Sequence, residues 1–227
     1  MIPWTLLDSA TVPEGGGELR LMRRGAEFSI RLGHNELMNS RVSGSEEALA
    51  TLACERIRSR QSPRVLIGGL GMGFTLRATL SALGTDAVII VAELVPAVIA
   101  WAKGPMAEVF RDSLADPRVR ILEADIGRLI RSEQSMFDAI LLDVDNGPDG
   151  LTRKANDALY HLDGLGAAHA RLDLGGVLAV WSAKPDPSFT QRLRKAGFAV
   201  DELRVRANRT RGAKHVIWIA TRRNGGQ

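Results

Sequence analysis

From Pro63 onward, short apolar runs alternate with segments that have the periodicity of helices. The apolar runs are continuous stretches of Val, Ile, Leu and Ala, such as VLIGG at 65–69 and AVIIVAE at 87–93. Strands that are apolar on both faces are typical of parallel sheets covered by helices on both sides. The alternation therefore predicts an α/β fold with a doubly wound, mostly parallel seven-stranded sheet.

The remaining elements follow from the same periodicity. Strands are expected at 65–69, 87–93, 118–124, 137–143, 175–181, 198–206 and 214–221, and helices from Ser45 to before Pro63 and at 73–83, 95–103, 126–133, 153–172 and 186–196. Residues 18–42 show short alternating runs that predict two or three antiparallel strands. We therefore expect an N-terminal β-strand and hairpin appendage at 1–44 and a Rossmann-like domain at 45–227.

Composition limits the class of protein. The chain has 227 residues, of which 45% are hydrophobic and 25% charged, so it is long enough to bury a core. It contains no apolar run of the roughly 18 residues that a membrane span needs, and its N-terminus has no signal-peptide pattern. The single cysteine, Cys54, excludes internal disulfides and agrees with a reducing compartment. We expect a cytoplasmic protein that does not bind membranes.

Positive charge gathers in the last fifth of the chain. Residues 184–227 hold eleven Lys or Arg against three Asp or Glu, although the whole chain carries only +4. Such asymmetry can indicate a nucleic-acid surface. The basic segment RVRANRTRG has no interleaved aromatic residues, so a solvated loop is the favoured interpretation and nucleic-acid binding the weaker one.

A glycine-rich turn follows the first predicted parallel strand. Gly69, Gly71 and Gly73 give the pattern G-x-G-x-G, typical of class I S-adenosylmethionine folds, rather than the dinucleotide pattern G-x-G-x-x-G. Glycines at this turn let a ligand approach the main chain closely. Glu93 ends the next strand, where a carboxylate can accept hydrogen bonds from ribose hydroxyls. Asp125 ends the third, where it can accept one from an adenine amino group.

The fourth predicted strand ends in LLDVDNGPDGL, which places Asp143, Asp145 and Asp149 close together. Carboxylates this close repel each other unless a cation is near. A metal, an amine substrate and a polar turn are all open interpretations. Metal ligation would draw on further acids or a histidine, and the four histidines share no spacing and suit surface or packing positions. We expect no metal and favour an amine, from which a carboxylate can take a proton.

These motifs together resemble the spermidine synthase-like aminopropyltransferases, a family within the class I methyltransferase fold. The resemblance covers about Gly33 to Ala220 and rests on VLIGGLGMGFTLR, VAELVPAVIAWAK, ILEADIGRLI and FDAILLDVDNGP, followed by LYHLDGL and LGGVLAVWSAKPD. It implies that Asp143 acts on the amine nucleophile, and that Asp145 and Tyr160 contact the amine substrate. It also implies a homodimer, and a donor site made of Gly69, Gly71, Gly73, Glu93, Asp125 and Ile126.

Several family features are missing. The family's glycine loop reads GGGDGG, whereas this loop has no aspartate, and the segment D-E-x-x-Y-H-E is replaced by SEEALATLA. Without the loop acid, both decarboxylated and intact S-adenosylmethionine become tolerable donors. The resemblance thus favours aminopropyl transfer to an amine, as in polyamine biosynthesis. The alternatives are a small-molecule methyltransferase and a non-catalytic protein that binds nucleosides or nucleic acid.

Overall fold

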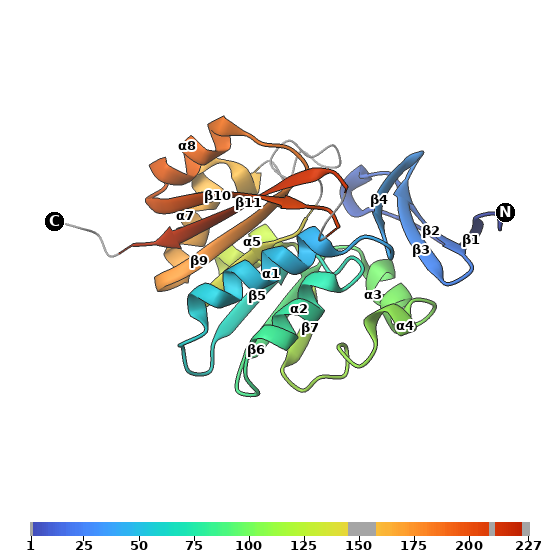
Figure 1. The fold of residues 1–227 in the computed structure, drawn as a ribbon, viewed down its shortest axis with the longest axis horizontal. Coiled ribbons are helices and arrows are strands. Elements are labelled where there is room, and N and C mark those ends of the chain that lie inside the picture. The colour runs from blue at the N-terminus through green and yellow to red at the C-terminus, as the bar shows by residue number, and fades with distance from the viewer. Residues whose placement is uncertain (1, 145–157, 209–211, 224–227) are drawn as a thin grey trace.

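The computed structural model of the chain describes residues 2–144, 158–208 and 212–223 (Figure 1). Within these ranges lie a seven-stranded sheet flanked by helices and a four-stranded N-terminal sheet. The predicted α/β class and the seven-stranded sheet are confirmed.

The large sheet has the strand order β10-β11-β9-β8-β5-β6-β7. Strand β11 pairs antiparallel with β10 and with β9, and the other four pairings in this sheet are parallel. The strands are β5 (Arg64–Gly68), β6 (Val88–Glu93), β7 (Val119–Glu123), β8 (Phe137–Leu142), β9 (Leu172–Ser182), β10 (Phe198–Arg206) and β11 (Lys214–Arg222). The order reverses between β5 and β8, and such a switch point is where open α/β sheets bind ligands.

Alternation along the strands divides the core into two layers. In β5, Val65 and Ile67 pack in one hydrophobic cluster with residues of α1, α2 and α3, whereas Leu66 packs in a second cluster with residues of α5, α7 and α8. The helices are α1 (Gly44–Ile57), α2 (Phe74–Ala82), α3 (Pro96–Lys103), α4 (Ala107–Phe110), α5 (Ile126–Ser132), α7 (Leu162–Arg171) and α8 (Pro187–Lys195). Since both faces of β5 are buried, its run had to be apolar throughout.

Two helices differ from those predicted from the sequence. The helix expected at 153–172 is described from residue 158, and α7 itself begins only at Leu162 and ends at Arg171. Strand β9 begins directly after α7, at Leu172, which is earlier than the expected start at 175. The short helix α4 was not expected, because four residues are too few to show a helical period.

The N-terminal sheet is larger than expected. It contains β1 (Thr5–Thr11), β2 (Glu18–Arg24), β3 (Glu27–Leu32) and β4 (Asn35–Asn39), all antiparallel, with a 3-10 turn at Pro13–Gly15. Strand β1 was missed because its residues TLLDSAT are mostly exposed and show no apolar alternation.

The N-terminal sheet packs onto the large one. Leu21, Phe28 and Ile30 belong to the same hydrophobic cluster as the α1, α2 and α3 layer. Figure 1 shows this sheet next to the ends of the central strands. The division of the chain at residues 44 and 45 stays a prediction, with α1 beginning at Gly44. No helix in the described ranges is both long and apolar enough to cross a membrane.

Candidate active site

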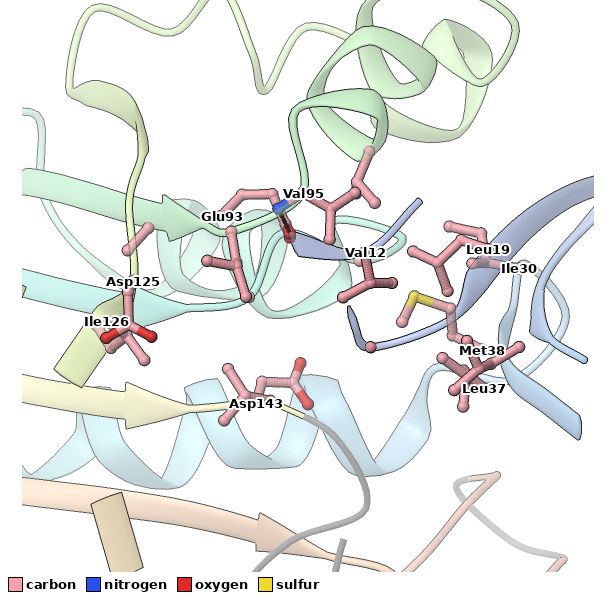
Figure 2. Close-up of a pocket in the computed structure, with 18 of the residues that line it drawn as sticks. Val12, Leu19, Ile30, Leu37, Met38, Glu93, Val95, Asp125, Ile126 and Asp143 are labelled. Carbon is pink, nitrogen blue, oxygen red and sulfur yellow. Dashed lines mark hydrogen bonds between the residues drawn. The ribbon is translucent and has the colours of Figure 1, made fainter. Parts of the chain in front are cut away.

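A pocket lies between the carboxyl ends of the central strands and the N-terminal sheet. It holds about 830 Å³ of empty space, a volume that includes the solvent at its open mouth. Figure 2 shows Val12, Leu19 and Ile30 facing the strand-end residues across it. Gly69, Gly71, Glu93, Asp125, Ile126 and Asp143 all line this main pocket, so six of the residues predicted from the sequence share one cavity.

Strand register explains why residues far apart in sequence meet here. Gly68 at the end of β5 pairs with Ala92 of β6 on one side and with Leu142 of β8 on the other. The residues that follow are Gly69, Glu93 and Asp143. Three carboxyl ends of parallel strands are thereby aligned at one edge of the sheet.

The glycine loop needs glycine for two different steric reasons. Gly69 has φ +90°, and a Cβ built on it would lie 2.5 Å from the carbonyl oxygen of Asp143. Gly73 has φ +72° and stands at the N-cap of α2, where a Cβ would lie 2.4 Å from the Phe110 ring. Positive φ and close packing both exclude a side chain, so the loop backbone lies directly against its neighbours.

Glu93 holds the glycine loop in place. One of its carboxylate oxygens accepts a hydrogen bond from the Leu70 N–H at 2.9 Å, and the other accepts one from the Val95 N–H at 2.8 Å. Burial raises the pKa of this carboxyl group, and these backbone donors oppose the rise. The backbone N–H groups of Leu94 and Gly71 also lower this pKa, so the Glu93 carboxylate lies among several backbone donors of the loop.

Asp125 has a structural role besides lining the pocket. It is the N-cap of α5, and its Oδ1 accepts a hydrogen bond from the Arg128 N–H at 2.7 Å. A carboxylate at a helix N-terminus is stabilised by the helix dipole. Ile126, the first residue of α5, is buried beside it. Together they form a polar and an apolar wall of the main pocket.

Asp143 lies just beyond β8 with a perturbed acidity. Burial raises its pKa to about 6, while the Thr75 hydroxyl, which donates to Oδ2 at 2.6 Å, opposes the rise. A carboxyl group with a pKa near neutrality can accept a proton during catalysis and release it again. Asp143 therefore has the properties of a general base.

A second, smaller pocket adjoins the main one, and both are lined by Leu37, Met38, Gly71 and Asp143. Its lining residues are Leu37, Met38, Glu46, Leu70, Gly71, Met72, Gly73, Phe74, Asp143 and Trp181. We call it the side pocket. Glu46 contributes a second carboxyl group, whose pKa is raised to about 7 by burial and by the negative charge of Asp143. Glu46 could not be predicted as a site residue, because its segment SEEALATLA lacks the tyrosine and histidine of the family's D-E-x-x-Y-H-E motif.

The raised pKa of Glu46 predicts how stability changes with pH. Since its folded-state pKa of about 7 exceeds the ordinary value of 4.5, its contribution is fully present below pH 4.5 and is lost as pH rises through 7. Glu46→Gln is therefore expected to raise the free energy of unfolding at pH 8 by about 1–2 kcal/mol, with a much smaller effect at pH 4.5.

Urea unfolding of the ligand-free protein at both pH values measures this difference. Glu55→Gln, an exposed change on the same helix, serves as the control and is expected to have little effect at either pH. The same change in stability at pH 4.5 and pH 8 for Glu46→Gln would contradict the assignment.

The predicted substrate contact Tyr160 lies outside both pockets. Tyr160 is 3% exposed, its hydroxyl donates to the Val144 carbonyl at 3.4 Å, and its ring packs edge-on against Phe189. It lines neither the main nor the side pocket, and its role toward the substrate stays a prediction. Asp145 and Asp149 lie outside the described residues. Among the described residues, no three His, Cys, Asp or Glu side chains group as a metal site would require.

Comparison with known proteins shows what the chain is similar to. No protein-family model matches the chain. Over 127 residues the chain is 31% identical to polyamine aminopropyltransferase 2 of Pseudomonas aeruginosa, a match that covers 54% of this chain and 34% of that protein. The spermidine synthase of Thermotoga maritima superimposes with a TM-score of 0.74 over 96% of this chain and 72% of its own, at 17% identity. The chain has the fold of the spermidine synthases. The predicted resemblance is thereby confirmed.

Methyltransferase-type proteins share part of this spermidine synthase-like fold. An O-methyltransferase family protein from Burkholderia thailandensis superimposes with a TM-score of 0.55 and 17% identity, covering 80% of this chain and 56% of its own. The spermidine synthase alignment thus extends over more of the chain. The match to the curated aminopropyltransferase spans about a third of that protein's length, 34%.

Proposed function

We propose that this spermidine synthase-like chain is a transferase that moves the aminopropyl group of decarboxylated S-adenosylmethionine to an amine. The observation that carries the proposal is Asp143, a carboxylate with a pKa of about 6 at the junction of the two pockets. A donor in one pocket and an acceptor in the other would meet at this residue. The similarity to an aminopropyltransferase supports the choice of reaction.

The donor is assigned to the main pocket. Glu93 would accept hydrogen bonds from the ribose hydroxyls, and Asp125 would accept one from the adenine amino group. Gly69 and Gly71 line this pocket, and because they have no side chains the loop backbone itself forms part of its wall. The apolar side chains from the N-terminal sheet, among them Val12 and Ile30, would cover the bound nucleoside and exclude water.

The acceptor is assigned to the side pocket. Glu46 and Asp143 supply negative charge there, which suits the ammonium group of an aliphatic amine. Phe74 and Trp181 add apolar surface for its methylene groups. Asp143 would take one proton from the ammonium, and the free amine would attack the carbon beside the sulfonium. The new C–N bond forms as the C–S bond breaks, and sulfur keeps the electron pair as methylthioadenosine leaves.

Methyl transfer from intact S-adenosylmethionine is the second candidate. The loop 69–73 carries no acidic side chain that would repel the carboxylate of that donor. Both reactions start from a sulfonium and differ in which carbon the nucleophile reaches in line. The fold similarity to an O-methyltransferase family protein favours keeping this candidate.

Calorimetric titration separates the candidates. The purified protein is titrated with decarboxylated S-adenosylmethionine, intact S-adenosylmethionine and methylthioadenosine, and products are then analysed with a panel of amines. We expect tighter binding of the decarboxylated donor and formation of methylthioadenosine. Preference for the intact donor with S-adenosylhomocysteine as product would establish methyl transfer. Binding of no donor, with salt-dependent binding of RNA or DNA, would favour the non-catalytic alternative.

Assembly and location follow the same proposal. We infer a homodimer and a cytoplasmic location, as predicted from the sequence. Size-exclusion chromatography with light scattering tests the first, and a monomer at all concentrations would refute it.

A further inference from the structure

A chain of hydrogen bonds leads away from the side pocket. The Ser45 hydroxyl donates to Oε2 of Glu46 at 2.7 Å, and Nδ1 of His215 lies 2.9 Å from the same hydroxyl oxygen. Glu46 in turn lines the side pocket together with Asp143. Three consecutive polar groups, Glu46, Ser45 and His215, thus connect the acidic pair to β11.

Packing positions Ser45 and His215 in this series of hydrogen bonds. Ser45 is 1% exposed, so its hydroxyl has little access to water. His215 is partly exposed, and its ring packs edge-on against Trp181 with centroids 4.8 Å apart. Burial lowers the pKa of His215, which keeps the ring neutral near pH 7. A neutral imidazole can accept a proton at one nitrogen and release one from the other.

The Ser45 hydroxyl has a single hydrogen, so it can donate either to Glu46 or to His215, and the hydrogen bond at one of these residues determines the hydrogen bond at the other. When Glu46 is ionised, Ser45 donates to it, so His215 must be the donor to Ser45 through Nδ1–H. When Glu46 is protonated, it can donate to Ser45, and Ser45 can then donate to Nδ1 of His215. A change in the protonation of Glu46 therefore reverses the whole chain of hydrogen bonds.

We propose that Glu46, Ser45 and His215 form the route by which the proton of the acceptor amine leaves the site. This inference rests on the proposed transfer reaction. An ammonium acceptor and a sulfonium donor give a secondary ammonium product, a neutral thioether and one proton. Asp143 and Glu46 receive that proton, Ser45 passes it to Nδ1 of His215, and Nε2 releases one to solvent. In this scheme His215 and Ser45 are positioning residues that act through the acidic pair.

The charged groups around this proton route come from several elements. Asp143 after β8 and Glu47 on α1 both act on Glu46. On β11, Lys214 precedes His215, and Arg206 on β10 pairs with Lys214, whereas Val205 is the partner of His215. Alternation along the strands places Lys214 and Arg206 on the opposite face from His215. The ionisation of Glu46 is thus governed first by burial and then by the charge of Asp143, with a smaller effect of Glu47.

Kinetic measurements test the role of His215 directly. His215→Ala and Ser45→Ala are expected to lower kcat about 10- to 100-fold with little change in the donor's Kd. Added imidazole is expected to raise the kcat of His215→Ala at least fivefold. The increase is expected to grow with the concentration of neutral imidazole. His169→Ala is the control, because His169 also packs edge-on against an aromatic ring, Phe198, and lies away from the site. Unchanged kcat in both variants, or a loss that imidazole does not relieve, would overturn the proposal.

A spectroscopic test does not depend on turnover. The ¹⁵N shifts of the His215 ring in the whole protein are expected to report the Nδ1–H tautomer at pH 8 and the Nε2–H tautomer as Glu46 protonates near pH 7. Glu46→Gln is expected to abolish this switch. One unchanging tautomer in the natural protein would refute the route. A switch in a protein that shows no transfer with any donor would instead refute the proposed reaction.

Discussion

Replacing Asp143 by asparagine is expected to lower kcat about 10³-fold, within the range that general bases contribute. Asparagine has nearly the same shape but cannot take a proton from the acceptor ammonium. The acidic limb of the pH profile for kcat in the natural protein is expected near pH 6, because Asp143 must be ionised to act. Donor binding is expected to stay within about twofold, since other residues hold the nucleoside.

Two further variants sharpen this test. Thr75→Val removes the hydroxyl that stabilises ionised Asp143, so it should move the acidic limb to higher pH without abolishing turnover. Asp163→Asn makes the same charge change at an exposed position in the first turn of α7, and it should leave kcat unchanged. Steady-state rates over a range of pH measure all three. Full turnover by Asp143→Asn would contradict the proposal that Asp143 takes the proton from the acceptor amine.

Gly69→Ala is expected to have the second large effect, a loss of about 2–4 kcal/mol in the free energy of unfolding together with the loss of donor binding. Residue 69 has φ +90°, which is unfavourable for any L side chain. The added Cβ would also lie 2.5 Å from the Asp143 carbonyl oxygen, so the loop or the end of β8 must move. Either movement separates groups that line the main pocket.

Gly166→Ala is the matched control. Gly166 lies inside α7 with open space around it, so alanine is expected to stabilise the protein by about 0.5–1 kcal/mol. Urea unfolding and donor titration of both variants measure the contrast. Equal stability and equal donor affinity for Gly69→Ala and Gly166→Ala would contradict the steric argument.

The strands of the large sheet could be predicted from the sequence because both of their faces are buried. Burial on both faces requires a continuous apolar run, and such a run is visible without knowledge of its neighbours. Strand β8, Phe137–Leu142, is buried throughout and was expected almost within its observed bounds. Strand β1, Thr5–Thr11, is mostly exposed, and its pairing with β2 depends on backbone hydrogen bonds that any sequence can make.

Some residues of the candidate site could likewise be predicted from the sequence, and others could not. Glu93, Asp125 and Asp143 could be predicted as pocket residues, because each lies at or just after the carboxyl end of a strand, and these ends must lie at one edge of a parallel sheet. Glu46, Ser45 and His215 carry no such signal. Ser45 and Glu46 lie in the first turn of helix α1, and His215 lies on the antiparallel strand β11, distant in the chain.

The sequence by itself thus determined the doubly wound fold, the glycine loop and the acidic strand ends, because these depend on local periodicity and on the direction of parallel strands. Only the tertiary structure decided that Glu46 faces Asp143 and that His215 contacts Ser45. The perturbed pKa values of the acidic pair arise from burial and from charges brought together across elements. Desolvation and through-space charge are properties of the packed molecule, so a linear pattern of residues does not contain them.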